Sequence, residues 1–146
     1  MKKMNNKGFS LVELIVVIAI MAVLIGVLAP QFLRYVEKSR LQKDNQAISE
    51  IAQAAKTAMA NETIYTAVGA GTSISATGKT YSFTPGTQTF EGELANTVGT
   101  SVGLSSKKYS TAPVINVTVN ATTSTVEVSA TGYFEDVSAD ASTKTF

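Results

Sequence analysis

The apolar residues near the start of the chain form one long, almost unbroken run. Residues 14–29 carry no polar side chain, and only Ser10 and Glu13 interrupt the apolar pattern over residues 9–29. At about 1.5 Å per helical residue, these 21 positions reach about 32 Å. Because the hydrocarbon layer of a bilayer is about 30 Å thick, the pattern predicts a membrane-spanning helix over residues 9–30.

Beyond this run the pattern becomes amphipathic over residues 31–60. Apolar side chains recur there mostly at spacings of three and four, which places them on one helical face. They are Leu33, Val36, Ile48, Ile51, Ala52, Ala55, Ala58 and Met59. The opposite face carries Arg34, Lys38, Lys43, Glu50 and Lys56. We expect one helix from Phe9 to about Ala60, apolar all round in its first half and striped in its second.

Two residues within this helix should weaken it locally. Pro30 lacks an N–H group and crowds the preceding turn, so the pattern predicts a kink there. Gly26, one turn earlier, adds backbone freedom. Residues 22–30 are therefore where the helix is expected to bend or unwind.

The composition changes after Asn61. Residues 61–146 hold 18 threonines and 11 serines, which suit exposed strands and loops better than helices. Apolar and polar residues alternate over 114–119 and over 125–131, which predicts two strands joined by a hairpin loop at 120–124. Their inward faces would carry Ile115, Val117, Val119, Val126, Val128 and Ala130.

The remaining signals in this region are weaker. We expect a short strand over 80–84 and a short helix around 93–98, and we interpret the glycine-containing residues 64–79 as a connecting loop. The last dozen residues are expected to be loosely ordered, although Phe146 could dock on the rest of the head. With so few large apolar residues, the sheet needs the helix stripe at 48–59 as a second layer. The expected fold class is α+β, with a long N-terminal helix packed on a small antiparallel sheet.

Composition and charge exclude several kinds of site. The chain has no cysteine and no histidine, so it has no disulfide, no thiolate metal site and no imidazole base or ligand. The formal net charge of +1 gives no indication of a nucleic-acid partner. Glu91 and Glu93, like Asp136 and Asp140, are expected to be solvated. The sequence therefore predicts no enzyme, no cofactor and no metal site.

Glu13 is the residue that a plain membrane anchor does not explain. A charged side chain at the centre of a membrane helix costs about 2.5–3.5 kcal/mol on insertion scales, and such residues often mark function. A positive charge at the same depth would offset that cost. Cleavage of the chain after Gly8 would supply one, as the free amine of Phe9. Three lysines lie within the first seven residues, just before that bond.

One stretch, together with this basic leader and the apolar run, resembles the processing site of type IV prepilins and the related pseudopilins. It reads Gly8-Phe9-Ser10-Leu11-Val12-Glu13-Leu14-Ile15. The resemblance covers about the first 35 residues. It implies that a prepilin peptidase cuts between Gly8 and Phe9 on the cytoplasmic side and N-methylates Phe9. It also implies that Glu13 is the assembly carboxylate, which pairs with the terminal amine of a neighbouring subunit.

The resemblance also implies a domain organisation. Residues 1–8 would be the leader peptide, 9–30 the transmembrane and assembly helix, 31–60 the amphipathic helix continuing into the head, and 61–146 the Ser/Thr-rich β head of a pilin fold. In filaments of this family the helix is often unwound just before the matching proline. Without cysteine, the chain lacks the disulfide that closes the C-terminal region of many Gram-negative major pilins, which favours a Gram-positive source or a pseudopilin.

The function implied is that of a structural subunit of a type IV pilus-like surface filament, serving adhesion, motility or DNA uptake. Its partners would be other copies of itself, the prepilin peptidase and methyltransferase, an assembly platform with its motor ATPase, and membrane lipid before assembly. The subunit would lie in the cytoplasmic membrane, N-terminus inside, and then in an extracellular filament. Two alternatives stay open: a pseudopilin of a type II secretion or competence system, and a membrane-anchored surface binding module that does not polymerise.

Two simpler signals compete with the prepilin interpretation. A secretory signal would be cut near Val27-Leu28-Ala29, directly before Pro30, and its apolar core is usually only about 7–15 residues long. A plain signal anchor explains the length of the run but not Glu13. The flanking charges leave the orientation open, because basic residues also follow Pro30.

Overall fold

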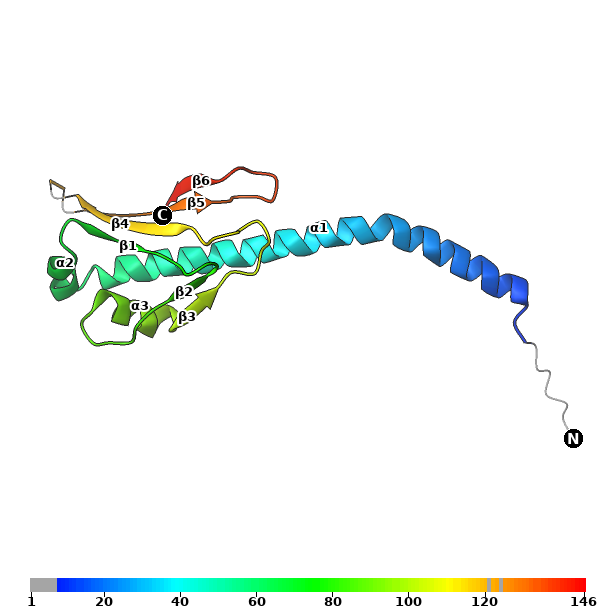
Figure 1. The fold of residues 1–146 in the computed structure, drawn as a ribbon, viewed down its shortest axis with the longest axis horizontal. Helices are drawn as coiled ribbons and strands as arrows, with labels where there is room; N and C mark the ends of the chain where they lie inside the picture. The colour runs from blue at the N-terminus through cyan, green and yellow to red at the C-terminus, as the bar shows by residue number, and fades with distance from the viewer. Residues whose placement is uncertain (1–7, 121, 124) are drawn as a thin grey trace, which may run out of the picture. The chain divides into compact units, whose positions relative to one another are not determined.

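The computed structural model describes residues 8–120, 122–123 and 125–146. Its first element is α1, a single helix over Leu11–Ala58 (Figure 1). This confirms the expectation of one continuous helix over most of the first 60 residues. By internal contacts the chain divides into two compact units, one ending at Val36 and the other covering Glu37–Phe146.

The first unit consists mainly of the apolar half of α1. Its large apolar side chains between Leu11 and Leu28 are 49–72% exposed. The mean hydropathy reaches 3.1 over an 18-residue window of the helix. By length and composition, this half of α1 is therefore able to cross a membrane.

The second unit, as far as the structure describes it, contains the rest of α1, two short helices and six strands. The helices are α2 (Glu62–Val68) and α3 (Phe90–Val98). The strands are β1 (Gly71–Ile74), β2 (Thr80–Ser82), β3 (Ser101–Gly103), β4 (Val114–Asn120), β5 (Thr125–Tyr133) and β6 (Ser142–Thr145). One antiparallel sheet has the order β1-β4-β5-β6, and β2 pairs with β3 in a second antiparallel sheet.

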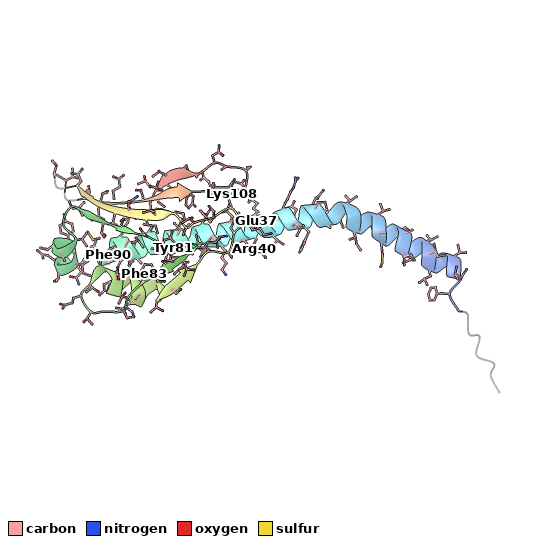
Figure 2. The ribbon with its side chains drawn as sticks, in the orientation of Figure 1. Glu37, Arg40, Tyr81, Phe83, Phe90 and Lys108 are labelled. Carbon is pink, nitrogen blue, oxygen red and sulfur yellow. The ribbon has the colours of Figure 1, made fainter. Side chains whose placement is uncertain are left out.

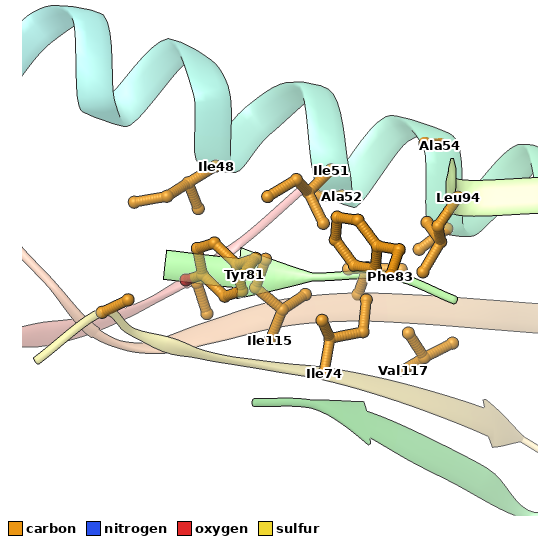
Figure 3. Packing of buried hydrophobic residues seen from close by; sticks show 14 of the residues in the cluster. Ile48, Ile51, Ala52, Ala54, Ile74, Tyr81, Phe83, Leu94, Ile115 and Val117 are labelled. Atoms are coloured by element: carbon orange, nitrogen blue, oxygen red, sulfur yellow. The ribbon is translucent and has the colours of Figure 1, made fainter. Parts of the chain in front are cut away.

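The core of this unit lies between α1 and the four-stranded sheet. Ile48 and Ile51 of α1 and Ile115 and Val117 of β4 are all fully buried in one cluster (Figure 3). Burial of one such side chain contributes about 1.5–3 kcal/mol. The α+β fold class is confirmed, as is the apolar stripe from Ile48 onward. Leu33, which was assigned to the same stripe, belongs to the first unit and is exposed.

Residues 64–79 are not the connecting loop that the sequence suggested. They include most of α2, whose start is capped by the Asn61 side chain, and all of β1. Gly69 ends α2 with a positive φ of 66°. Gly71 begins β1, where a Cβ atom would lie only 2.6 Å from the main-chain oxygen of Val117. The glycines therefore end a helix and allow close strand pairing, rather than marking a loop.

The expectation of loose order in the last dozen residues was wrong for residues 142–145, which form β6, whereas the docking of Phe146 allowed by the sequence is confirmed. β6 pairs with β5, and the rings of Phe146 and Tyr133 meet edge to face with their centroids 6.1 Å apart. Among the other strands, β2, β4 and β5 lie where strands were expected, whereas β3 was not predicted. α3 begins at Phe90, earlier than expected, because the Thr89 hydroxyl accepts the N–H of Gly92 and caps it.

Candidate functional site

The expected processing site lies in an exposed segment just before α1. Gly8, Phe9 and Ser10 precede the first helical residue. The Phe9 side chain is 94% exposed, and a Cβ atom at Gly8 would have no neighbour within 4 Å. The bond between Gly8 and Phe9 is therefore open to a second protein, and packing within this chain does not require glycine at position 8. The lysines of the expected leader lie outside the described residues.

Glu13 has a hydrogen-bond partner within its own chain. Its carboxylate accepts the main-chain N–H of Ser10 at 3.0 Å. This is one half of a capping box, in which a glutamate three residues after a serine satisfies a free N–H at the helix start. The negative charge also lies at the positive end of the helix dipole. The Ser-x-x-Glu spacing that signals this role was present in the sequence and was overlooked.

Gly26 and Pro30, the two expected kink residues, lie inside α1, and the backbone is helical through both. A Cβ atom at Gly26 would meet nothing within 4 Å. Proline has no N–H group, so the bond that residue 30 would donate to the carbonyl of Gly26 is missing. The helix therefore lacks one hydrogen bond, the one that would join residues 30 and 26.

A second polar cluster, not expected from the sequence, joins α1 to the loop after β3. Asp44 is only 2% exposed, and its carboxylate accepts the main-chain N–H groups of Ser105 and Ser106 at 2.9 and 2.6 Å. Glu37, two turns earlier, accepts the Ser106 hydroxyl and the Lys107 N–H, both at 2.6 Å. We call Glu37, Asp44 and these three loop residues the carboxylate clamp.

The surroundings of Glu37 in the clamp favour its ionised form. The hydrogen bond from the Ser106 hydroxyl is the main cause that holds the pKa of Glu37 below its ordinary value, and burial opposes it. Arg40, 4.0 Å from Glu37, contributes in the same direction as the hydrogen bond (Figure 2). Positions 37, 41, 44 and 48 follow the helical spacing of the stripe. If the apolar stripe that contains Ile48 is continued toward the N-terminus at the same spacing, it passes through Asp44 and Glu37. The sequence pattern could therefore have placed both carboxylates on the inward face of α1.

A network of uncharged groups also joins the second half of α1 to the segments before β4 and after β5. The Tyr109 hydroxyl donates to Asn45 Oδ1 at 2.7 Å, and Asn45 Nδ2 donates to the main-chain oxygen of Phe134 at 2.8 Å. Burial raises the pKa of Tyr109 to about 12, so this hydroxyl keeps its proton at physiological pH. Among the described residues, no three Asp or Glu side chains gather as a metal site would require, and no buried polar side-chain atom lacks a partner.

Comparison with known proteins identifies the N-terminal segment. The family model described as the prokaryotic N-terminal methylation motif matches residues 3–29. This match contains Gly8, Phe9 and Glu13 together with most of the apolar run. No curated protein and no solved structure matches the chain. The chain thus carries, over residues 3–29, the N-terminal methylation motif of type IV prepilin-type proteins.

Proposed function

We propose that this chain is the precursor of a structural subunit of a type IV pilus-like filament. One observation carries the proposal: the methylation motif over 3–29 coincides with the part of α1 whose apolar side chains are exposed on every side. Such a surface is stable in lipid or among identical helices, and unfavourable in water. The unit from Glu37 onward buries its own core and would form the head.

The proposed processing follows the motif. A prepilin peptidase cuts between Gly8 and Phe9 and N-methylates Phe9. Residues 1–8 are the leader, 9–30 the membrane and assembly helix, 31–60 the amphipathic helix, and 61–146 the β head. The subunit waits in the cytoplasmic membrane with its N-terminus inside. It then enters an extracellular filament through an assembly platform driven by a motor ATPase.

Glu13 is proposed to set the register of assembly. Helices that pack without water between them make an unpaired charge costly, so a carboxylate there requires a partner. The methylated amine of Phe9 keeps its positive charge after processing, and a neighbouring subunit can present it. The uniform apolar run from Leu14 onward supplies no comparable marker of axial position. Within one chain, the Ser10 N–H stabilises the carboxylate until that pairing occurs.

Gly26 and Pro30 are proposed as the place where the helix adapts during assembly. The missing bond between them lowers the cost of bending or unwinding residues 22–30. The helical backbone seen there in the single chain is the starting state of that change.

A pseudopilin of a secretion or competence system is the alternative within the same family, and both share the processing step. A long filament on the cell surface favours a pilin, whereas a short fibre confined to the envelope favours a pseudopilin. A membrane-anchored binding module that does not polymerise would form neither.

The test is the identity of the mature N-terminus. Mass spectrometry of the N-terminal peptide should find N-methylated Phe9, and Gly8→Val should leave the uncut precursor in the membrane, because the peptidase would meet a side chain at the cleavage position. Gly26→Ala serves as the matched glycine control and should be cut normally. A mature protein beginning at Pro30 would show instead that the segment is an ordinary secretory signal. Electron microscopy of sheared surface material then separates the filament from the lone anchor.

A further inference from the structure

Basic side chains gather where α1 enters the head. Six of the eight lysines and arginines from residue 37 onward lie there, and we call them the basic end: Lys38, Arg40, Lys43, Lys79, Lys107 and Lys108. The other two are Lys56, which bonds to the main-chain oxygen of Phe146, and Lys144 of β6. In the proposed orientation, the usual preference for basic residues on the cytoplasmic side of a membrane does not explain the basic end.

The carboxylate clamp holds the two loop lysines at this end. The Lys107 N–H donates to Glu37 at 2.6 Å, which fixes the loop where the head begins. The Lys79 ammonium donates to the main-chain oxygen of Ser106 at 2.8 Å, so the start of β2 is drawn to the same place. Figure 2 shows Lys108 at the same end of the head as Glu37. Residues from three parts of the sequence therefore form the basic end.

Carboxylates neutralise only part of this charge. Arg40 lies 4.0 Å from Glu37, and Lys38 lies 4.0 Å from Asp136. Asp44 is buried and bonds to the loop. Four amines of the basic end form no ion pair with the described residues, and they belong to Lys43, Lys79, Lys107 and Lys108. The basic end therefore keeps several positive charges that can attract an anionic partner.

The far end of the head is acidic. α2 carries Glu62 in its first turn, and α3 carries Glu91 and Glu93. Figure 1 shows α2 beyond the C-terminal end of α1, and Figure 2 shows Phe90, the first residue of α3, on the side away from Glu37. Charge within the head is thus separated along α1. A negatively charged surface would attract the basic end and repel the far end.

The length of α1 limits the distance between the basic end and a membrane. If residues 9–30 cross the bilayer as proposed, only eight residues separate Pro30 from Lys38, and in a helix they extend about 12 Å. The headgroup layer adds about 5–8 Å to each side of the hydrocarbon. Electrostatic attraction acts over about a further 8 Å in physiological salt. Lys38 is therefore within reach of the headgroups, and Lys107 is held one residue nearer to Pro30.

We propose that the basic end binds the anionic phospholipid headgroups of the membrane surface from which α1 emerges, before the subunit enters a filament. The inference rests on the proposed membrane stage of the subunit. Charges spread around a helix suit a flat surface better than one small ligand. The contact orients the head, with its acidic far end away from the membrane, and it is released when the subunit leaves the bilayer.

The test compares the full-length chain, labelled with ¹⁵N, in two kinds of lipid nanodisc. One contains phosphatidylcholine alone, and the other also contains phosphatidylglycerol, which is anionic. Both include a trace of lipid with a nitroxide on its headgroup. Broadening of the Lys107 amide resonance by the nitroxide should be at least about threefold greater in the anionic discs, because attraction brings the basic end to the surface. In about 1 M salt, where the screening length is about 3 Å, this difference should disappear.

A matched pair of double variants locates the contact. Lys43→Gln combined with Lys107→Gln removes two exposed charges of the basic end, and should reduce the broadening of the Lys108 amide in anionic discs to its value in neutral discs. Lys56→Gln combined with Lys144→Gln makes the same change of net charge elsewhere in the head and should leave the broadening unchanged. Circular dichroism checks that both variants are folded.

Several results would overturn the proposal. Equal broadening in the two kinds of disc is the first, and it needs no folded variant. Equal loss in both double variants would show that net charge matters and the basic end does not. Equal shifts by free glycerol phosphate would indicate a phosphate site in place of a surface contact.

Two further results separate this proposal from others. A shift of the Lys107 amide in neutral discs that grows with the number of chains per disc would assign the basic end to the acidic end of a second copy, and would overturn lipid binding. A chain that enters neither kind of disc would contradict the membrane stage of the proposed function, and this inference with it. A chain that enters both discs and shows no lipid preference would overturn this inference alone.

Discussion

The two halves of α1 use their apolar residues in opposite ways. In the first half, side chains on every side of the helix are exposed, such as Ile15 at 51% and Leu24 at 55%. In the second half, the apolar residues lie on one face, where Ile48 and Ile51 are fully buried. One half is suited to any nonpolar surrounding, whereas the other is suited to one partner, the sheet of its own chain. The first half of this continuous helix is therefore stable wherever water is excluded, whereas the second half is stabilised by packing on the sheet of its own chain.

The carboxylates of the two halves differ in the same way. Glu13 accepts one hydrogen bond, from a residue three positions away, and stays exposed. Asp44 is buried and accepts bonds from the two consecutive residues Ser105 and Ser106, far along the chain. The first carboxylate is satisfied locally and can still take a partner outside the chain. The second already has its full set of partners inside the head.

The largest expected effect comes from separating the halves. A chain shortened to begin at Glu37 should be soluble, monomeric and folded without detergent, because its apolar stripe is already covered by the sheet. The mature full-length chain should require detergent. Size-exclusion chromatography and circular dichroism measure both. An unfolded shortened chain would mean that the head needs the first half of α1, so that the two halves are not independent.

The next effect concerns Glu13. Glu13→Val should leave membrane insertion and cleavage largely intact, since an apolar residue suits a membrane helix. It should abolish or sharply reduce filaments, because the partner for the Phe9 amine is lost. Glu50→Val, an exposed carboxylate of the second half of α1, is the matched control. Filaments of normal number and length from Glu13→Val subunits, expressed without wild type, would rule out the assembly role.

The elements that could be predicted from the sequence are the long ones with a regular pattern. The long helix and the hairpin of β4 and β5 were predictable, because their periodic patterns extend over many residues. α2, β1 and β6 were not, since each is short and is held by caps or by strand partners distant in sequence. The motif around Gly8 was readable because its residue types and spacing are specific. The clamp at Asp44 was not predicted, because its partners lie about 60 residues away, in the loop at 105–107.

A pair of isoleucine truncations compares the two halves quantitatively. Ile51→Ala should lower the free energy of unfolding of the head by about 2–5 kcal/mol, because it leaves a cavity in a packed core. Ile15→Ala removes the same atoms from an exposed position and should change the stability of the head by less than about 0.5 kcal/mol. Urea unfolding of the full-length chain in detergent, followed by near-ultraviolet dichroism of the tyrosines, measures both. Equal losses would show that the two halves are not energetically distinct.

A smaller loss is expected at the buried carboxylate. Asp44→Asn keeps the shape of the side chain but removes its charge and replaces one acceptor oxygen by a donor. The Ser105 N–H, which lies 2.9 Å from both oxygens, and the Ser106 N–H must then share the remaining oxygen. Because hydrogen bonds to a charged group contribute about 1.5–3 kcal/mol each, their weakening should lower the stability measurably. The same unfolding assay measures it. A neutral Asp44→Asn would mean that water replaces the lost hydrogen bond.

The smallest effect is a pH dependence at Glu37. Its pKa in the folded head lies below the ordinary value of 4.5, so the folded state binds its proton less readily than the unfolded state does. By linkage, the carboxylate contributes its full stabilisation above the unfolded pKa and loses it as the pH falls through the folded pKa. Glu37→Gln should therefore be less stable than wild type at pH 7, and the difference should shrink below about pH 4.5.

The size of this effect is limited by exposure. The Glu37 side chain is 24% exposed, so solvent weakens its interactions relative to those of Asp44. Glu127→Gln is the control for the change of charge alone, because it lies on the exposed face of β5 and its carboxylate accepts no hydrogen bond from the described residues. Unfolding midpoints measured from pH 7 to pH 3 give the comparison. A constant difference between Glu37→Gln and wild type over this range would mean that the glutamate stabilises the loop by its shape and not by its charge.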